Sequence, residues 1–229
     1  MPPPVPPTPV GTYMLKTPSP TLVIEVFLDL CGAANPQQPP SAPHPTPPGC
    51  PSARGSQPFR LTDAVPRSCC PFSKKMFDVL NGEVMPALQA GGKVDTLFQN
   101  VPQPWHPQST WMHEVSLAVK ALDESKFYAA TAAIFAVQEK FFDSEVEDKS
   151  RKQILTELAA VVAPATGLEA SAVLAQVALA GEGNKGSATT QQIKWAVKYH
   201  RCRGIHVTPT VLLNGLEAPD VSSGWTAEQ

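Results

Sequence analysis

The stretch Cys70-Pro71-Phe72-Ser73-Lys74-Lys75 decides which fold we expect, because it places a cysteine in the first turn of a predicted helix. Downstream, apolar side chains recur at helical spacing, at positions 72, 76, 77, 80, 84 and 88, and Gly91-Gly92 ends the pattern. Upstream, the run 22–28 (LVIEVFL) is rich in β-branched and aromatic residues, as is typical of a buried strand. We therefore expect a strand that leads into a helix begun by Cys70.

A cysteine at a helix start favours thiol chemistry. The free backbone N–H groups and the positive end of the helix dipole stabilise a thiolate there. Lys74 and Lys75 add positive charge in the same turn. We take Cys70 as the candidate nucleophile.

Composition limits the other classes of function. The chain has 229 residues, 42% of them hydrophobic, which suits one domain, and its net charge of −2 gives no reason to expect a nucleic-acid or membrane partner. We see neither a signal peptide nor the run of about 18–20 apolar residues that spans a bilayer, so we expect a cytoplasmic protein. Five cysteines without a disulfide-framework spacing predict free thiols, and the absence of a Cys-x-x-Cys pair argues against a metal site.

Proline content divides the chain into two regions of different composition. Of 26 prolines, 18 precede position 67. We expect residues 1–10 to be a disordered leader, residues 11–229 to be one domain, and residues 32–69 to be a disordered insertion within it. Without the insertion, Cys31 would run directly into Cys70-Pro71 as an ordinary strand-to-helix turn. The insertion is either a genuine surface loop or an unspliced segment carried into translation, and we favour the second.

The rest of the chain alternates strands and helices. We expect an edge strand at 11–15, a strand at 93–101, helices from Ser109 to about 122 and at about 125–142, 147–162, 168–180 and 188–202, and a strand with a hairpin turn after Pro209. Thr226 with Gln229 has the pattern of a capping box that opens one more helix.

Two motifs together resemble the DsbA-like branch of the thioredoxin-fold superfamily. They are the strand followed by Cys70-Pro71-Phe72-Ser73, and the later Val207-Thr208-Pro209-Thr210 that enters a strand. The resemblance covers about 11–30 and 70–229. It implies an α/β thioredoxin-like fold in which a helical subdomain, here about 107–180, is inserted between an N-terminal βαβ unit and a C-terminal ββα unit.

The resemblance also implies roles for particular residues. Cys70 would be the nucleophile, and Pro209 a cis-proline facing it. Pro71, Phe72, Thr208 and Pro209 would bind a peptide or a small thiol or disulfide. Where dithiol members of the family have a second cysteine, this chain has Ser73, which can hydrogen-bond a thiolate but cannot resolve a mixed disulfide.

We therefore expect a thiol-disulfide oxidoreductase that uses Cys70 alone. No bound cofactor is expected, and an external thiol such as glutathione would serve as co-substrate. Two alternatives remain. One is a non-catalytic thioredoxin-like domain that docks peptides near Pro209. The other is a glutathione transferase or isomerase of kappa type, which has serine at the position of Cys70 and is disfavoured by the cysteine.

Other reactive residue types have simpler interpretations. His106, between Trp105 and Pro107, could act as a general base, but packing or capping is the favoured role. We expect Cys31 to be a buried small apolar residue and Cys202 to be structural. Cys69 could resolve a disulfide of Cys70 only if the insertion is real.

Overall fold

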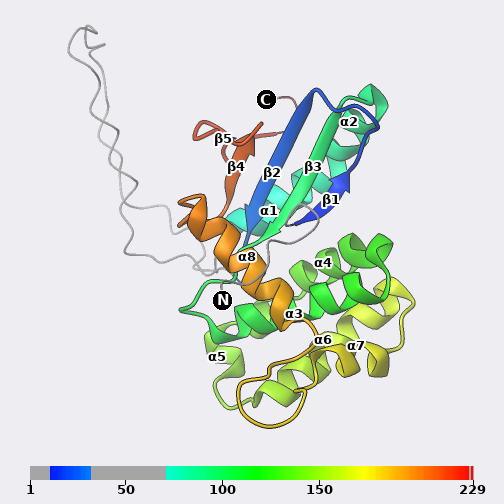
Figure 1. Cartoon of the computed structure of the whole chain (residues 1–229), viewed down its shortest axis with the longest axis vertical. Helices are drawn as coiled ribbons and strands as arrows, with labels where there is room; N and C mark the ends of the chain where they lie inside the picture. Colours follow the sequence, from blue (N-terminus) through cyan, green and yellow to red (C-terminus); the bar gives the residue numbers. More distant parts are fainter. Residues whose placement is uncertain (1–10, 32–70, 227, 229) are drawn as a thin grey trace, which may run out of the picture.

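A mixed five-stranded sheet forms the centre of the chain (Figure 1). The computed structural model describes residues 11–31, 71–226 and 228, and for Pro71 the backbone alone. The strand order is β1-β3-β2-β4-β5, with β2 and β3 parallel and the other pairs antiparallel. The strands are β1 (Thr12–Leu15), β2 (Leu22–Leu28), β3 (Val94–Asn100), β4 (Thr210–Leu213) and β5 (Leu216–Glu217). The expected edge strand and the expected central strands are confirmed.

Alternation along β2 gives the sheet two buried faces. Val26 and Leu28 belong to the large core that includes Phe77 of α1 (Pro71–Val79), whereas Phe27 points the other way and stacks on Tyr199 of α8 (Thr190–Cys202), with ring centroids 6.1 Å apart. Because successive side chains of a strand point to opposite faces, α1 and α8 cover opposite sides of the sheet. A strand covered on both sides has to be apolar throughout, as the run 22–28 nearly is.

A layer of helices at one end of the sheet occupies residues 107–177, close to the expected subdomain of about 107–180 (Figure 1). Its α-helices are α3 (Pro107–Leu122), α4 (Phe127–Ala136), α5 (Asp143–Val146), α6 (Arg151–Thr166) and α7 (Ala170–Val177). Short 3-10 turns at Glu124–Lys126 and Gln138–Phe141 flank α4. The thioredoxin-like fold with a helical insertion is thus confirmed.

The helix after Cys70 is less regular than its apolar spacing predicts. α1 continues into a π-helical turn at Leu80–Val84 and then into α2 (Met85–Gly91). Pro86 explains the irregularity, because it has no N–H and its ring crowds the carbonyl of the preceding turn. The end at Gly92 is as predicted, with the left-handed φ of 63° that glycine adopts most easily.

Two helices of the inserted layer have bounds that differ from the predicted ones. The helix expected at 125–142 stops at Val137, which leaves the α-helical region with φ −115° and ψ 12°. The helix expected at 147–162 begins instead after Ser150, which forms a capping box with Gln153, and it runs through Pro164 to Thr166. Proline removes one hydrogen bond from a helix without necessarily ending it, and Gly167 at φ 72° provides the actual stop.

The predictions for both ends of the chain and for the insertion lie wholly or partly outside the described residues. They concern the leader 1–10, the insertion 32–69 and the capping box, because Gln229 is not described. The flanks of the insertion do meet as expected, since the Asp29 amide donates to Ser73 Oγ at 3.4 Å across 44 positions. The strand-to-helix unit is therefore formed around the insertion.

Phe98 of β3 packs against α1 and against α4 of the inserted helical layer, so its loss should destabilise the fold. Its side chain is fully buried and makes edge-to-face contacts with Phe77 of α1 and Phe127 of α4. We expect Phe98→Ala to lower the free energy of unfolding by about 3–5 kcal/mol in urea titrations. The control is Leu216→Ala at a side chain that is 76% exposed, which should cost about 0.5 kcal/mol or less. Equal effects would contradict this view of the core.

His200, near the end of α8, should make stability depend on pH. Burial lowers the pKa of His200, outweighing the opposing hydrogen bond to the Ile205 carbonyl, and its Nε2 is buried without a partner among the described residues. A lowered pKa in the folded state means that stability is kept above the unfolded-state pKa of about 6.5 and lost as pH falls through the folded-state value. We expect the free energy of unfolding of His200→Gln to fall less between about pH 7 and 5 than that of the wild type. Identical slopes in denaturant titrations would refute the assignment.

Candidate functional site at the sheet edge

The described residues of the two predicted motifs lie at one edge of the sheet. β2 and β3 are parallel, so both end there, and β4 begins there because Thr210 pairs with Phe27 near the end of β2. The hydrogen bond from the Asp29 amide to Ser73 Oγ holds the first turn of α1 at the same edge. The two motifs, far apart in sequence, thus meet in space.

The first motif is partly described. Cys70 lies outside the described residues, and Pro71, the first residue of α1, is known by its backbone alone. Phe72 is 49% exposed, whereas Ser73 is fully buried. Ser73 therefore anchors the helix through its contact with Asp29, and its hydrogen bond to the Cys70 sulfur stays a prediction.

Of the two lysines in the first turns of α1, one is paired with a carboxylate and the other is not. Lys74 pairs with Asp78 one turn later on α1. Lys75 is exposed and has no ion pair among the described residues. Positive charge in this turn therefore comes mainly from Lys75 and from the start of the helix itself.

The second motif has the backbone that the resemblance implied. The Thr208–Pro209 peptide bond is cis, as expected. Both residues are half-buried, and the Thr210 hydroxyl donates to the Val207 carbonyl at 2.9 Å. Within the described part of the chain, the Thr208 backbone makes no hydrogen bond. The backbone donor and acceptor of Thr208 therefore have no partner among the described residues, just before β4 begins.

Beneath this edge lies a buried polar network that the sequence analysis missed. Asp29 is fully buried, and its Oδ1 accepts from the Ser109 hydroxyl at 2.5 Å and from the Cys31 amide at 3.2 Å. His113 Nε2 lies 3.3 Å from the same oxygen, and His113 Nδ1 contacts Asn100 Oδ1 at 2.8 Å. The one signal in the sequence was an aspartate between Leu28 and Leu30, where an apolar strand ends.

A second polar pair connects His106, in the segment before α3, with Asp143 at the start of α5. His106 Nδ1 is 3.0 Å from both carboxylate oxygens of Asp143, and Gln108 Nε2 donates to Asp143 Oδ1 at 2.7 Å. Partial burial raises the pKa of Asp143, but the hydrogen bonds from Gln108 and His106 outweigh it, so the pKa lies below its ordinary value. His106 is 8% exposed, whereas its neighbour Trp105 is 59% exposed.

The two described cysteines, Cys31 and Cys202, differ in environment. Cys31 is 1% exposed, which confirms the prediction of a buried residue, and its sulfur donates to the Phe141 carbonyl at 3.7 Å. Cys202 is exposed at the end of α8, so the structural role expected for it finds no support in its packing.

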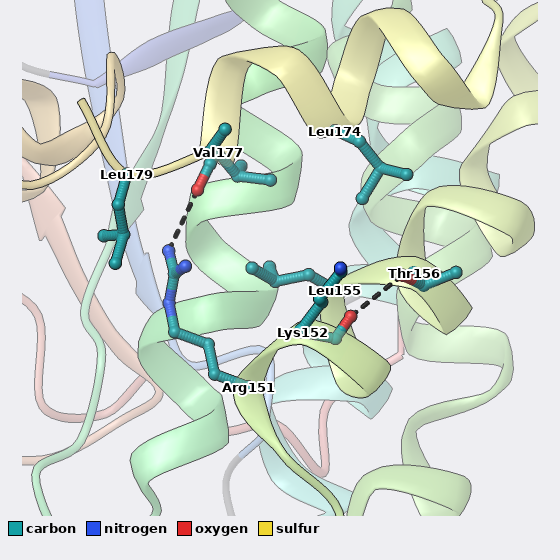
Figure 2. Close-up of a pocket in the computed structure, with 8 residues that line it drawn as sticks. Arg151, Lys152, Leu155, Thr156, Leu174, Val177 and Leu179 are labelled. Atoms are coloured by element: carbon teal, nitrogen blue, oxygen red, sulfur yellow. Dashed lines mark hydrogen bonds between the residues drawn. The ribbon is translucent and has the colours of Figure 1, made fainter. Parts of the chain in front are cut away.

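A separate pocket of about 400 Å³ lies between α6 and α7 (Figure 2). Leu155 and Leu174 point into it, and Arg151 crosses one end to donate to the Val177 carbonyl at 3.1 Å. None of the predicted site residues lines this pocket. The sheet edge remains the candidate site.

We searched the described residues for membrane-spanning helices and for metal-binding clusters. None of their helices is long and apolar enough to cross a membrane. Among the same residues, no cluster of His, Cys, Asp and Glu side chains has the grouping of a metal site.

Removing the Asp29 carboxylate should destabilise the sheet edge. Asp29→Ala removes the carboxylate that accepts from the buried Ser109 hydroxyl. We expect the free energy of unfolding to fall by about 3 kcal/mol, measured by urea titration, because breaking a buried polar cluster on one side is costly. Asp220→Ala, at an exposed aspartate, is the control and should be nearly neutral. A neutral Asp29→Ala would show that the network is not needed.

Comparison with known proteins supports the fold, but it does not assign the chain to a sequence family. No family model matches the chain, and no curated protein matches it. Solved structures do match. A candidate protein-disulfide isomerase from Pseudomonas syringae is 23% identical, with a TM-score of 0.61 over 91% of this chain and 90% of the other.

Two further structures have lower identity. BdbD from Bacillus subtilis is 15% identical, with a TM-score of 0.54 over 92% of this chain and 84% of that one. The thiol-disulfide exchange protein alpha-DsbA2 from Wolbachia pipientis is 14% identical, with a TM-score of 0.51 over 90% and 77% of the two chains. The chain therefore has the thioredoxin-like fold with a helical insertion that DsbA-like proteins share.

Proposed function

We propose that this protein is a thiol-disulfide oxidoreductase that acts through Cys70 and uses an external thiol to complete its cycle. The single observation that carries the proposal is the meeting of two segments at one edge of the sheet. There the first turn of α1, which directly follows Cys70, is hydrogen-bonded to the end of β2, and β4 begins beside it after a cis-proline.

The position of Cys70 in the sequence supports the proposal. Cys70 directly precedes Pro71, the first residue of α1, so the proposed nucleophile would act at the start of this helix. Backbone N–H groups without partners in the first helical turn, together with Lys75, favour a thiolate over a thiol. This supports a nucleophilic role for Cys70.

The proposed cycle has two exchanges. In the first, the Cys70 thiolate attacks one sulfur of a disulfide R–S–S–R′, forms a mixed disulfide with R–S, and releases R′–S⁻. Ser73 has no sulfur with which to attack that bond, so an external thiolate attacks the R–S sulfur and releases Cys70 as a thiolate. Glutathione is the proposed external thiol. No net oxidant or reductant is consumed beyond the disulfide and the thiol that enter.

Thr208 is the proposed docking point for a peptide substrate. Its backbone makes no hydrogen bond within the described part of the chain, and it precedes the strand β4. An extended peptide can pair with such a backbone as an added strand. Phe72 and Val207, which are about half exposed, would offer apolar contact to its side chains. Pro71 and Pro209 are proposed to border the same position.

The proposed function leads us to expect a reducing cellular compartment. A single nucleophilic thiol that depends on an external thiol suits a reducing environment, which supports the cytoplasmic location expected from the sequence. Fractionation of cells that express the full chain would test it.

Alkylation of Cys70 tests the proposal directly. We expect its rate with iodoacetamide, followed residue by residue by mass spectrometry, to rise with pH at a midpoint at least about one unit below the free-cysteine value of about 8.5. The Cys70→Ser variant is the control that identifies the labelled site.

Other outcomes point away from the proposal. A midpoint at or above about 8.5 would overturn it and favour a peptide-binding domain without thiol chemistry. Glutathione conjugation to an electrophile that survives Cys70→Ser would favour a glutathione transferase instead.

A further inference from the structure

We propose that the pocket between α6 and α7 binds a small amphipathic anion, that is, a molecule with an apolar chain and one negatively charged head group such as a carboxylate. The pocket lies apart from the proposed thiol chemistry, because none of the predicted site residues lines it. All of its lining residues belong to α6, to α7 or to the two positions that directly follow α7.

The walls of the pocket are apolar. Leu155 of α6 and Leu174 of α7 point into it, and Val177 and Leu179 also line it (Figure 2). Leu155 and Val177 are almost fully buried, whereas Leu174 is half-buried and Leu179 is 65% exposed. The volume of about 400 Å³ is near the lower end of the range for small-molecule sites. An apolar chain in this space would cover apolar surface that now faces water.

The polar groups of the lining already have partners within the protein. The Thr156 hydroxyl donates to the Lys152 carbonyl at 2.9 Å. Arg151 Nη2 donates to the Glu114 carboxylate at 2.7 Å and to the Val177 carbonyl at 3.1 Å. A polar chain would lose its hydrogen bonds to water on entering the pocket, whereas an apolar chain has none to lose. We therefore assign the interior to the apolar part of the ligand.

The charges beside the pocket favour an anionic head group. The two charged residues that line the pocket, Arg151 and Lys152, are both basic. Glu114 pairs with Arg151, but Lys152 is exposed and has no ion pair among the described residues. Glu157, the one acidic residue of α6, pairs with Lys149 at 2.8 Å, and α7 has no charged residue. A positive charge without a partner therefore lies beside the apolar space, which complements an amphipathic anion.

The test uses octanoate as the probe, added to the ¹⁵N-labelled full chain and followed by the amide shifts in NMR spectra. We expect shifts confined to α6, α7 and the two residues after α7. Across the series from butanoate to decanoate, the dissociation constant should fall about fourfold for each added CH₂ that is buried, and the gain should end once the pocket is full. Shifts spread over the whole surface, or a gain that continues with every CH₂, would overturn the inference.

Lys152 provides the test of the head group. Lys152→Gln should weaken octanoate binding about two- to fivefold, as expected for an exposed ion pair, and should leave the binding of uncharged 1-octanol unchanged. The matched control is Lys140→Gln, at an exposed lysine of the same helical layer that does not line the pocket, and it should bind octanoate as the wild type does. Octylamine, a cation at neutral pH, should bind more weakly than octanoate.

Two further variants test the location of the site. Ala178→Trp places a large ring at an exposed residue that lines the pocket, and it should weaken octanoate binding at least about tenfold by filling the space. Leu179→Ser removes apolar contact and should weaken binding about fourfold. Because the Leu179 side chain is 65% exposed, this second variant should keep the stability of the wild type, which a urea titration checks.

The outcomes decide the inference without involving Cys70. If Ala178→Trp and Leu179→Ser are folded and bind octanoate as tightly as the wild type, the pocket is not the site and the inference falls. If octylamine binds as tightly as octanoate, or Lys152→Gln changes nothing, the preference for an anion is wrong. Loss of binding in Ala178→Trp, with weakening by Lys152→Gln for octanoate alone, would establish the site. The proposed thiol function is tested separately by the alkylation of Cys70.

Discussion

The buried carboxylate of Asp29 is the point on which the arrangement of the sheet edge depends. It joins the end of β2 to α3 through Ser109 and His113, and its own amide holds the first turn of α1. A buried polar group is costly without hydrogen bonds, so the contacts of Asp29 Oδ1 favour keeping these elements together, although its Oδ2 is buried without a partner among the described residues. The network thereby brings the start of α1, the start of α3 and the polypeptide around Cys31 to one place.

The inserted helical layer contributes polar side chains to the sheet edge and to the segment before α3. Its first helix, α3, supplies Ser109 and His113 to the network, and α5 supplies Asp143 to the imidazole of His106. His106 itself lies in the segment between β3 and α3. A thioredoxin-like sheet without the insertion would lack the carboxylate partner of this histidine, so the contact between His106 and Asp143 depends on the inserted helices.

A single cysteine in the first motif changes what the rest of the site has to provide. With Ser73 buried against Asp29, no second sulfur in this turn of α1 can complete the exchange. Under the proposed function, the thiol that resolves the mixed disulfide therefore comes from outside the protein. None of the predicted site residues lines the separate pocket between α6 and α7, which is why the proposed chemistry is assigned to the sheet edge.

The sequence by itself determined the order of strands and helices, because that order depends on the local spacing of apolar, proline and glycine residues, and its resemblance to DsbA-like proteins pointed to the cis bond before Pro209. It did not predict the run of α6 through Pro164, because local propensity is overridden by packing and caps elsewhere. Only the tertiary structure decided the partners of Asp29 and His106. Their partners lie up to 84 and 37 positions away, and no local pattern records which distant side chains will meet across a folded edge.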